Sequence, residues 1–204
     1  MKSLMTALLA AWILGFSAGE MSAQVRTVTL GITTHCPYGV GGCWAEIRNG
    51  LNLPDAIAAI PQKPDTKTQT FDLHMREDWR PDPGLFARNF KTMNVGVDVR
   101  GVEAMVDGVV QKDGTNLMLR VNGSDVLMRL APLTRTVHWD TKRNRAATPT
   151  RAERTAYEKL TGQSKKQAVR VRVVGPLIQE PAAADKPSRQ ILEVRKFELL
   201  KKAA

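Results

Sequence analysis

The sequence predicts an α+β protein in two parts, a mixed part followed by a part made mainly of strands. Stretches in which apolar and polar residues alternate predict strands along most of the chain. Segments with apolar residues three and four positions apart predict short helices. After residue 100 the expected strands follow one another with a single helix among them, which separates the two parts.

Residues 25–100 contain four expected strands and two expected helices. The strands are 25–33, 56–60, 68–76 and 95–100, and the helices are 42–51 and 82–93. Asp82 is the expected cap of the second helix, and Pro83 suits its first position because proline lacks a backbone N–H. The order strand, helix, strand, strand, helix, strand predicts a ferredoxin-like βαββαβ domain, with both helices on one face of an antiparallel sheet.

Residues 101–200 contain five expected strands and one helix. The strands are 101–114, 116–121, 125–133, 167–177 and 191–200. Asn122-Gly123 is a strong hairpin signal, and Thr150 with Glu153 forms a capping box that opens a helix. Because this helix falls between the third and fourth strands, the order predicts an OB-like five-stranded β-barrel.

The first residues have the layout of a secretory signal peptide. Lys2 is followed by an apolar run over residues 4–16 and then by small residues as far as Ala23. The run is shorter than the ~20 residues that span a bilayer, although an uncleaved anchor is the alternative. We therefore expect a signal peptide over 1–23, a ferredoxin-like domain over 24–100 and an OB-like domain over 101–204. The mature protein would be periplasmic or secreted, without a transmembrane anchor.

The chain is strongly basic, with a formal net charge of +10. A basic exported protein suits an acidic partner protein or a polyanion. Four arginines are expected on the outer face of the barrel, where the alternative is an ordinary solvated surface: Arg120, Arg129, Arg170 and Arg172. Nucleic acid is not expected as the partner, because the barrel has few outward aromatic residues on which bases could stack.

Catalysis finds little support in the sequence. It contains no Gly-x-Ser-x-Gly elbow, no phosphate-binding loop and no His-Glu-x-x-His motif. Asp72 and His74 fall on the polar side of one expected strand, where a solvated surface explains them. We therefore expect a protein that is not an enzyme.

The most unusual stretch is THCPYGVGGCW, residues 34–44, which holds both cysteines of the chain. With the strand before it and the passage LNLPDAIAAI after it, this stretch resembles the heavy-metal-associated domains of copper chaperones and mercury-binding proteins. In that family two loop cysteines bind a soft metal ion. Here Cys36 and Cys43 are seven positions apart, where the family has three, and Thr34 replaces the family's methionine.

A metal site and a disulfide are the two hypotheses for these cysteines. For the first, Cys43 would lie in the first turn of a helix, which favours a thiolate. Two thiolates suit Cu(I), and His35 would be a third ligand. For the second, an exported protein meets an oxidising compartment, where two cysteines normally pair. The expected function is exported binding or carriage of a soft metal, most plausibly copper; the alternative is a non-catalytic binding or assembly module with a structural disulfide.

Overall fold

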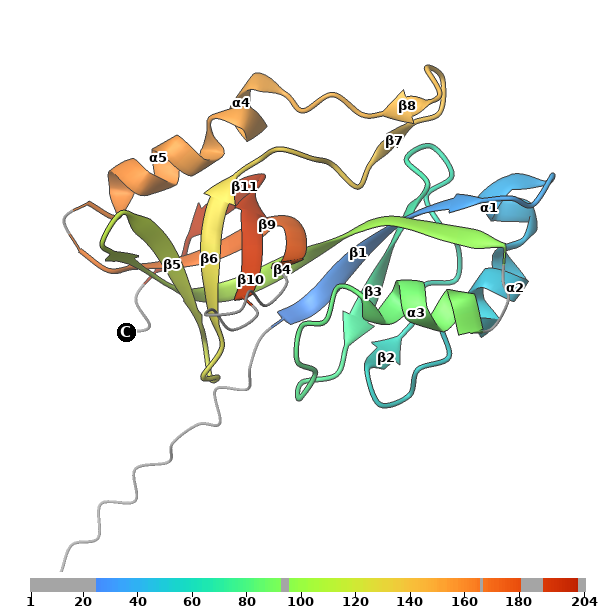
Figure 1. Cartoon of the computed structure of the whole chain (residues 1–204), viewed down its shortest axis with the longest axis horizontal. Coiled ribbons are helices and arrows are strands. Elements are labelled where there is room, and N and C mark those ends of the chain that lie inside the picture. Colours follow the sequence, from blue (N-terminus) through green and yellow to red (C-terminus); the bar gives the residue numbers. More distant parts are fainter. Residues whose placement is uncertain (1–24, 93–95, 166, 181–188, 202–204) are drawn as a thin grey trace, which may run out of the picture.

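The structure is a computed structural model, and it describes residues 25–92, 96–165, 167–180 and 189–201. The expected signal peptide, 1–23, lies outside the described residues. The described chain is an α+β fold in which strands predominate (Figure 1). In these ranges, no helix has the length and apolar character needed to cross a membrane.

The first four strands form an antiparallel sheet in the order β2-β3-β1-β4. Its elements are β1 (Val25–Thr34), β2 (Ile57–Ala59), β3 (Thr70–Met75) and β4 (Val97–Asp113). The helices beside it are α1 (Gly39–Gly42), α2 (Trp44–Asn49) and α3 (Leu85–Thr92). Alternation in β1 and β3 turns Leu30 and Leu73 to one face, where they are buried with Ile47 of α2 and Phe86 of α3. Asp72 and His74 lie on the opposite, polar face, as the alternation predicted.

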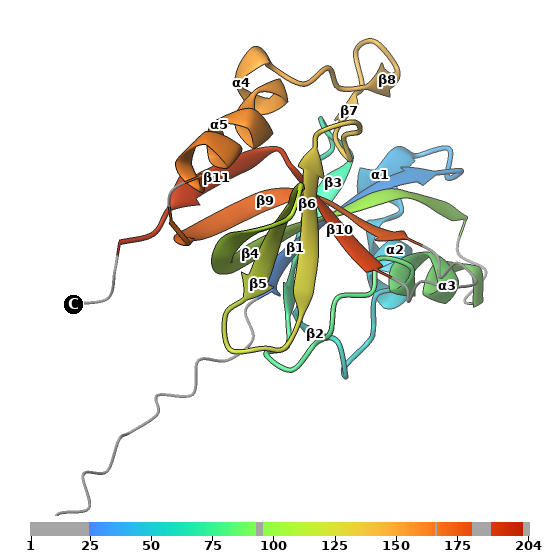
Figure 2. The same ribbon diagram turned by 60° about the vertical axis from the view of Figure 1, so that its left-hand side comes forward.

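The remaining strands close into a five-stranded barrel, which confirms the barrel expected from the sequence. Neighbouring strands around it are β4, β5, β6, β10 and β9, and β9 pairs again with β4. Their bounds, with β4 above, are β5 (Asn116–Val121), β6 (Leu127–Pro132), β9 (Val169–Glu180) and β10 (Arg189–Val194). Helices α4 (Arg151–Arg154) and α5 (Ala156–Gln163) fall between the third and fourth barrel strands. Helix α5 contacts β6, β10 and β11 (Lys196–Leu199), and Figure 2 shows it beside β11.

Strand β4 belongs to both parts of the molecule. Its first half pairs with β1, from Val97 to Val106, and its second half pairs with β5 from Gly108. The expected boundary between residues 100 and 101 therefore falls inside one continuous strand. The buried apolar residues of the sheet and of the barrel also form one cluster, so the two parts share a core as well as a strand.

Several local expectations differ from the structure. The helix expected over 42–51 begins earlier and is interrupted at Cys43. The capping box of Thr150 and Glu153 forms as predicted, but the helix that it opens is interrupted at Thr155. The hairpin at Asn122-Gly123 has a longer loop than two residues, because β6 begins only at Leu127. A small hairpin of β7 (Trp139–Asp140) and β8 (Arg145–Ala146) lies in a stretch where no strand was expected.

Candidate functional site

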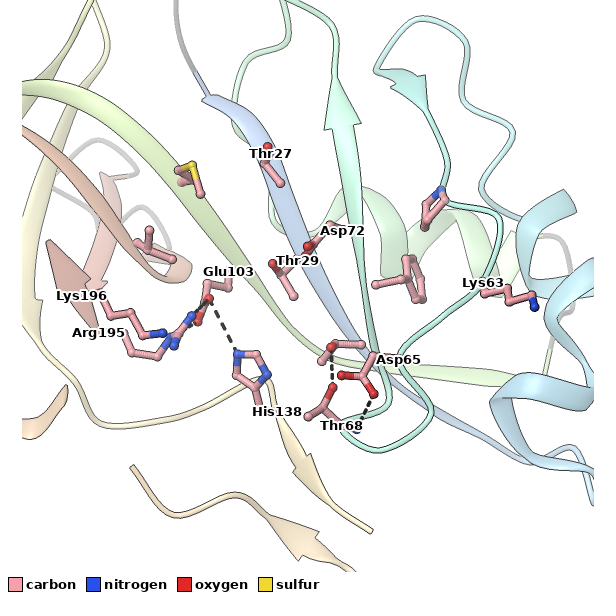
Figure 3. Close-up of a pocket in the computed structure, with 15 residues that line it drawn as sticks. Thr27, Thr29, Lys63, Asp65, Thr68, Asp72, Glu103, His138, Arg195 and Lys196 are labelled. Atoms are coloured by element: carbon pink, nitrogen blue, oxygen red, sulfur yellow. Dashed lines mark hydrogen bonds and ion pairs between the residues drawn. The ribbon is translucent and has the colours of Figure 1, made fainter. Parts of the chain in front are cut away.

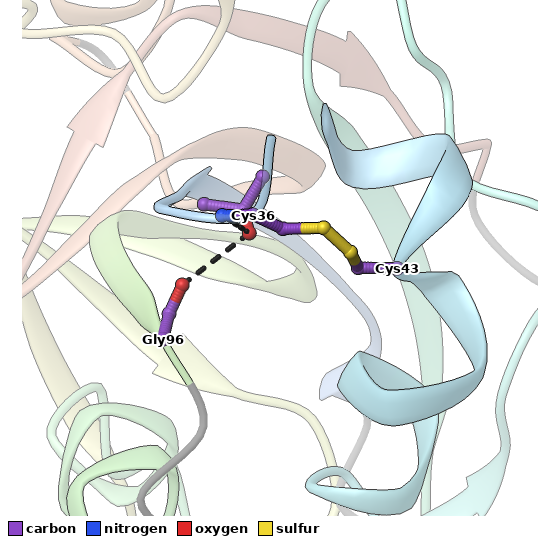
Figure 4. Close-up of a disulfide and its surroundings, with 4 residues drawn as sticks. Cys36, Cys43 and Gly96 are labelled. Atoms are coloured by element: carbon purple, nitrogen blue, oxygen red, sulfur yellow. Dashed lines mark hydrogen bonds between the residues drawn. A yellow bond between two sulfur atoms is a disulfide. The ribbon is translucent and has the colours of Figure 1, made fainter. Parts of the chain in front are cut away.

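The two cysteines form a disulfide at the end of β1 (Figure 4). Their Cα atoms are 6.5 Å apart, within the range that a disulfide requires. The chain reverses between them because Gly39 adopts a positive φ of 68° and donates its backbone N–H to the Cys36 carbonyl. The Thr34 hydroxyl supports the turn, accepting from the Cys36 N–H at 3.1 Å and donating to the Gly96 carbonyl. The disulfide alternative for this loop is thereby the arrangement observed.

His35 is not directed at the two sulfurs. Its Nε2 lies 2.8 Å from Asp98 Oδ2, in an exposed pair at the edge of the sheet. Among the described residues, no three His, Cys, Asp or Glu side chains are grouped as they would be around a metal ion. A pocket of about 290 Å³ does lie beside the loop, and His35, Cys36 and Cys43 are among its lining residues. Copper binding by Cys36, Cys43 and His35 therefore stays a prediction for the reduced protein.

The four arginines expected on the outer face of the barrel all alternate with buried residues in their strands. Arg172 donates two hydrogen bonds to Asp107, at 2.7 and 2.8 Å, and these bonds raise its pKa. Arg129 lies 3.6 Å from Glu180. Arg120 on β5 and Arg170 on β9 are the cross-strand neighbours of Val109 on β4. Neither arginine has an ion pair in the described part of the chain. An acidic partner for this face stays a prediction.

The sequence did not reveal a cavity of about 630 Å³ on the polar face of the first sheet, where the sheet meets the barrel. We call it the junction cavity (Figure 3). Two cross-strand rows form its floor. Asp72, Thr29 and Glu103 are opposite one another on β3, β1 and β4, and Thr27 and Met105 are paired in the next row. The Thr29 hydroxyl donates to Asp72 Oδ1 at 2.6 Å, so the floor is itself hydrogen-bonded.

One wall of the junction cavity is a buried cluster of charged groups around Arg195, which stands between β10 and β11. Arg195 Nε donates to Glu103 Oε2 at 2.7 Å, its second terminal nitrogen donates to Glu103 Oε1, and its other terminal nitrogen donates to Glu153 at 3.0 Å. Glu103 is only 1% exposed. His138 Nε2 lies 3.8 Å from Glu103 Oε1, too far for a direct hydrogen bond, and has no such partner among the described residues.

The pKa values in this cluster keep the carboxylates charged. Burial raises the pKa of Glu103, but the neighbouring His138 and Arg195 more than offset burial and hold it below its usual range. Burial also raises the pKa of Glu153, but the hydrogen bonds from Thr150 and Arg195 lower this pKa by more than burial raises it. Burial lowers the pKa of Arg195, and its two carboxylate partners raise it further than burial lowers it. A buried cluster of this kind is costly unless all its members stay paired.

The opposite wall is the loop of residues 61–69, which is fixed by many hydrogen bonds. Arg100 donates to the carbonyls of Thr68, Gln69 and Val137 at 3.2, 3.0 and 3.0 Å and lies over the Trp139 ring. It has no carboxylate partner in the described chain, and burial lowers its pKa to about 10. Gln69 has a positive φ of 50°, which is strained for a residue with a side chain.

No family model, curated protein or solved structure matches this chain. Any function must therefore rest on the chemistry of its side chains. In the sequence, Glu103 alternates with Val102 and Ala104, which indicates the opposite face of the strand but gives no sign that the barrel covers this residue. Arg195 was not predicted as a site residue because it was expected inside a continuous strand, and His138 was not predicted as one because it lies in a polar stretch. An isolated acid between Val102 and Ala104 was the one available signal.

Proposed function

We propose that the chain is an exported, non-catalytic binding module in which the Cys36–Cys43 disulfide is structural. The observation that carries this proposal is the disulfide itself, which leaves neither sulfur free as a ligand. His35, the third expected ligand, is paired with Asp98. The bridge joins the end of β1 to the start of α2, so it holds the first helical turn against the sheet. Binding is then assigned to the surfaces described above and not to the sulfurs.

The strand order supports a finer description of the fold. The order β4-β1-β3-β2, with two helical segments on one face, is that of a ferredoxin-like unit. In the barrel, the third and fifth strands, β6 and β10, are parallel and adjacent, and helices precede the fourth strand. This is the order of an OB-like barrel. Both folds occur with many unrelated functions, so they are compatible with a binding module without specifying what it binds.

Cysteine variants test whether the disulfide is structural. Cys36→Ser and Cys43→Ser should each lose about 2–3 kcal/mol of stability, since either change opens the same small loop. The double variant should lose no more than either single variant, because the bridge can be removed only once. Thermal and urea unfolding of the four proteins without reductant measures this. Losses that simply add in the double variant would show that each cysteine acts alone, and the structural role would be wrong.

A redox-gated copper site is the second candidate, favoured by the pocket of about 290 Å³ that His35, Cys36 and Cys43 share. Reduction would leave two thiols and an imidazole around one space, a ligand set that suits Cu(I). The reduced protein should then bind one Cu(I) tightly, while His35→Ala weakens binding and either serine variant abolishes it. Titration of oxidised and reduced protein against a chromogenic Cu(I) chelator decides the matter. Absence of a tight site in the reduced protein would remove this candidate.

A further inference from the structure

We propose that the junction cavity binds a small hydroxylated carboxylate, the class of compound to which sugar acids belong. This inference rests on the proposed binding-module function and names the ligand of that module. Cavities of this size are usual for small-molecule sites, and such sites often lie where two structural parts meet. Here the floor comes from the first sheet, and one wall comes from Val174 of β9, from Arg195 and from Lys196 of β11.

The cavity is held open by fixed groups. The 61–69 loop is tied to α2 by the bond from Trp44 Nε1 to the Gln62 carbonyl at 2.8 Å, and to β1 by the bond from the Ile32 N–H to the Gln69 carbonyl at 3.1 Å. The Arg100 guanidinium donates both to the end of this loop and to the segment that carries His138, so it holds the two together. Strained backbone such as that of Gln69 is concentrated at ligand-binding sites. Because the side chains and loop around a preformed cavity are already ordered, they lose little conformational entropy when a ligand binds.

The free hydrogen-bonding groups at one end of the cavity suit an anion. The carboxylates that line it already accept hydrogen bonds from the protein: Asp65 from the Lys67 and Thr68 N–H groups, Asp72 from Thr29, and Glu103 from Arg195. The Lys196 ammonium, by contrast, has no hydrogen bond or ion pair in the described part of the chain, and it lies beside Arg195 at the barrel end of the cavity (Figure 3). A net charge of +10 would also draw an anion toward the protein.

The rest of the cavity suits hydroxyl groups. The cavity is lined by the hydroxyls of four threonines: Thr27 and Thr29 on β1, Thr68 before β3 and Thr70 in β3. The Thr29 hydroxyl donates to Asp72, so toward a ligand it can only accept. The Thr68 and Thr70 hydroxyls are 2.8 Å apart, and Asp72 keeps a second oxygen that can accept from a ligand. A ligand with its carboxylate toward Lys196 and its hydroxyls toward Asp72 and the threonines would match both ends. An apolar ligand would leave these polar groups without water or a partner, which is unfavourable.

Binding measured by ligand-observed NMR tests the inference with three probes. Galacturonate carries both the carboxylate and the hydroxyls, galactose carries only the hydroxyls, and propionate carries only the carboxylate. Galacturonate should bind at least about tenfold more tightly than either partial probe, since each loses hydrogen bonds that the cavity offers. Equal binding of all three, or no binding of galacturonate, would overturn the inference.

Three variants locate the binding. Lys196→Met should weaken galacturonate binding about fivefold, the effect of losing one solvent-exposed charge partner, and should not weaken galactose. Asp72→Asn should weaken both sugars. Lys91→Met, on the exposed surface of α3, is the matched control and should change neither. Because Lys196 and Asp72 are exposed, all three variants should melt like the parent protein. Galacturonate binding that Lys196→Met and Asp72→Asn leave unchanged would place the ligand elsewhere and overturn the inference.

The same spectra separate this inference from the proposed function. Conversion of galacturonate to another compound during incubation would contradict the non-catalytic role while leaving the binding site in place. Failure of galacturonate to bind, in a protein whose cysteine variants show the expected shared loss of stability, would overturn the ligand assignment and leave the structural disulfide standing.

Discussion

Arg195 and Glu103 form a doubly hydrogen-bonded ion pair at the junction of the sheet and the barrel. Their side chains are 11% and 1% exposed. Glu103 lies on the strand that both parts share, and Arg195 lies where the chain passes from β10 to β11. A third group, Glu153, binds the same guanidinium from α4. One buried cation thus connects the sheet, the barrel and the helix that follows its third strand.

Removing one member of this pair should destabilise the protein strongly. Glu103→Gln leaves Arg195 buried with only Glu153 as a charged partner, and breaking a buried pair typically costs about 3–5 kcal/mol. Urea unfolding at pH 7 measures the change. Glu158→Gln, an exposed site on α5, is the matched control and should change stability by less than about 0.5 kcal/mol. Equal effects of the two variants would show that the Arg195–Glu103 pair contributes nothing particular to stability.

Acid should weaken the fold through the same cluster. The pKa values of Glu103 and Glu153 lie below their ordinary value of 4.5 in the folded protein. Their contribution to stability is therefore complete above about pH 4.5 and is lost as the pH falls through the folded values. The free energy of unfolding, measured from pH 7 to pH 3, should fall less steeply in the Glu103→Gln variant than in the parent. Parallel curves would contradict the role of Glu103 in this pH dependence.

Arg100 should be sensitive to a change that keeps its charge. Lysine cannot donate to several carbonyls in one plane as the guanidinium does, so Arg100→Lys should break some of these bonds. The Thr68 and Gln69 carbonyls keep the Trp139 and Ile32 N–H donors, whereas the Val137 carbonyl has no other donor among the described residues. A loss of about 1–3 kcal/mol is expected, the penalty for leaving buried groups unpaired. Arg26→Lys, at an exposed position of β1, is the control and should be nearly neutral. Amide exchange should also quicken in residues 61–69 of the Arg100 variant alone.

The shared strand predicts how fragments behave. A fragment of residues 24–100 lacks the part of β4, Gly101 to Val106, that pairs with β1 from Val25 to Gly31, so it should be largely unfolded. A fragment of residues 24–113 restores those pairings and should gain strand signal in circular dichroism and dispersed amide resonances. If the shorter fragment folds as well as the longer one, residues 24–100 are an independent domain after all.

The alternation of apolar and polar residues along the strands predicted most of what could be predicted of the fold. They placed Asp72 and His74 on the polar face of β3, and Val171 and Val173 inside the barrel with Arg172 outside. They did not show that the polar face near Glu103 is covered, because that depends on the long-range pairing of β4 with β9. The break at Arg195 was equally hidden, since the residues on both sides of it keep a strand pattern and only the ion pair with Glu103 explains its place.

The cysteine loop was predictable as a choice between two chemistries but not as an outcome. Spacing and glycine content allow the two sulfurs to meet each other or one metal ion, and redox state decides between these. Nothing in the sequence marked the bond from His35 to Asp98, because the two residues come together only when β4 pairs with β1.

The intact mass of the protein, purified from its own compartment without reductant, tests the central claim most directly. A disulfide between Cys36 and Cys43 predicts a mass about 2 Da below that of the reduced chain, with no thiol that reacts with an alkylating reagent before reduction. A mass increased by one copper ion, together with two thiols that alkylation detects after the metal is removed, would contradict the claim that the bridge is structural.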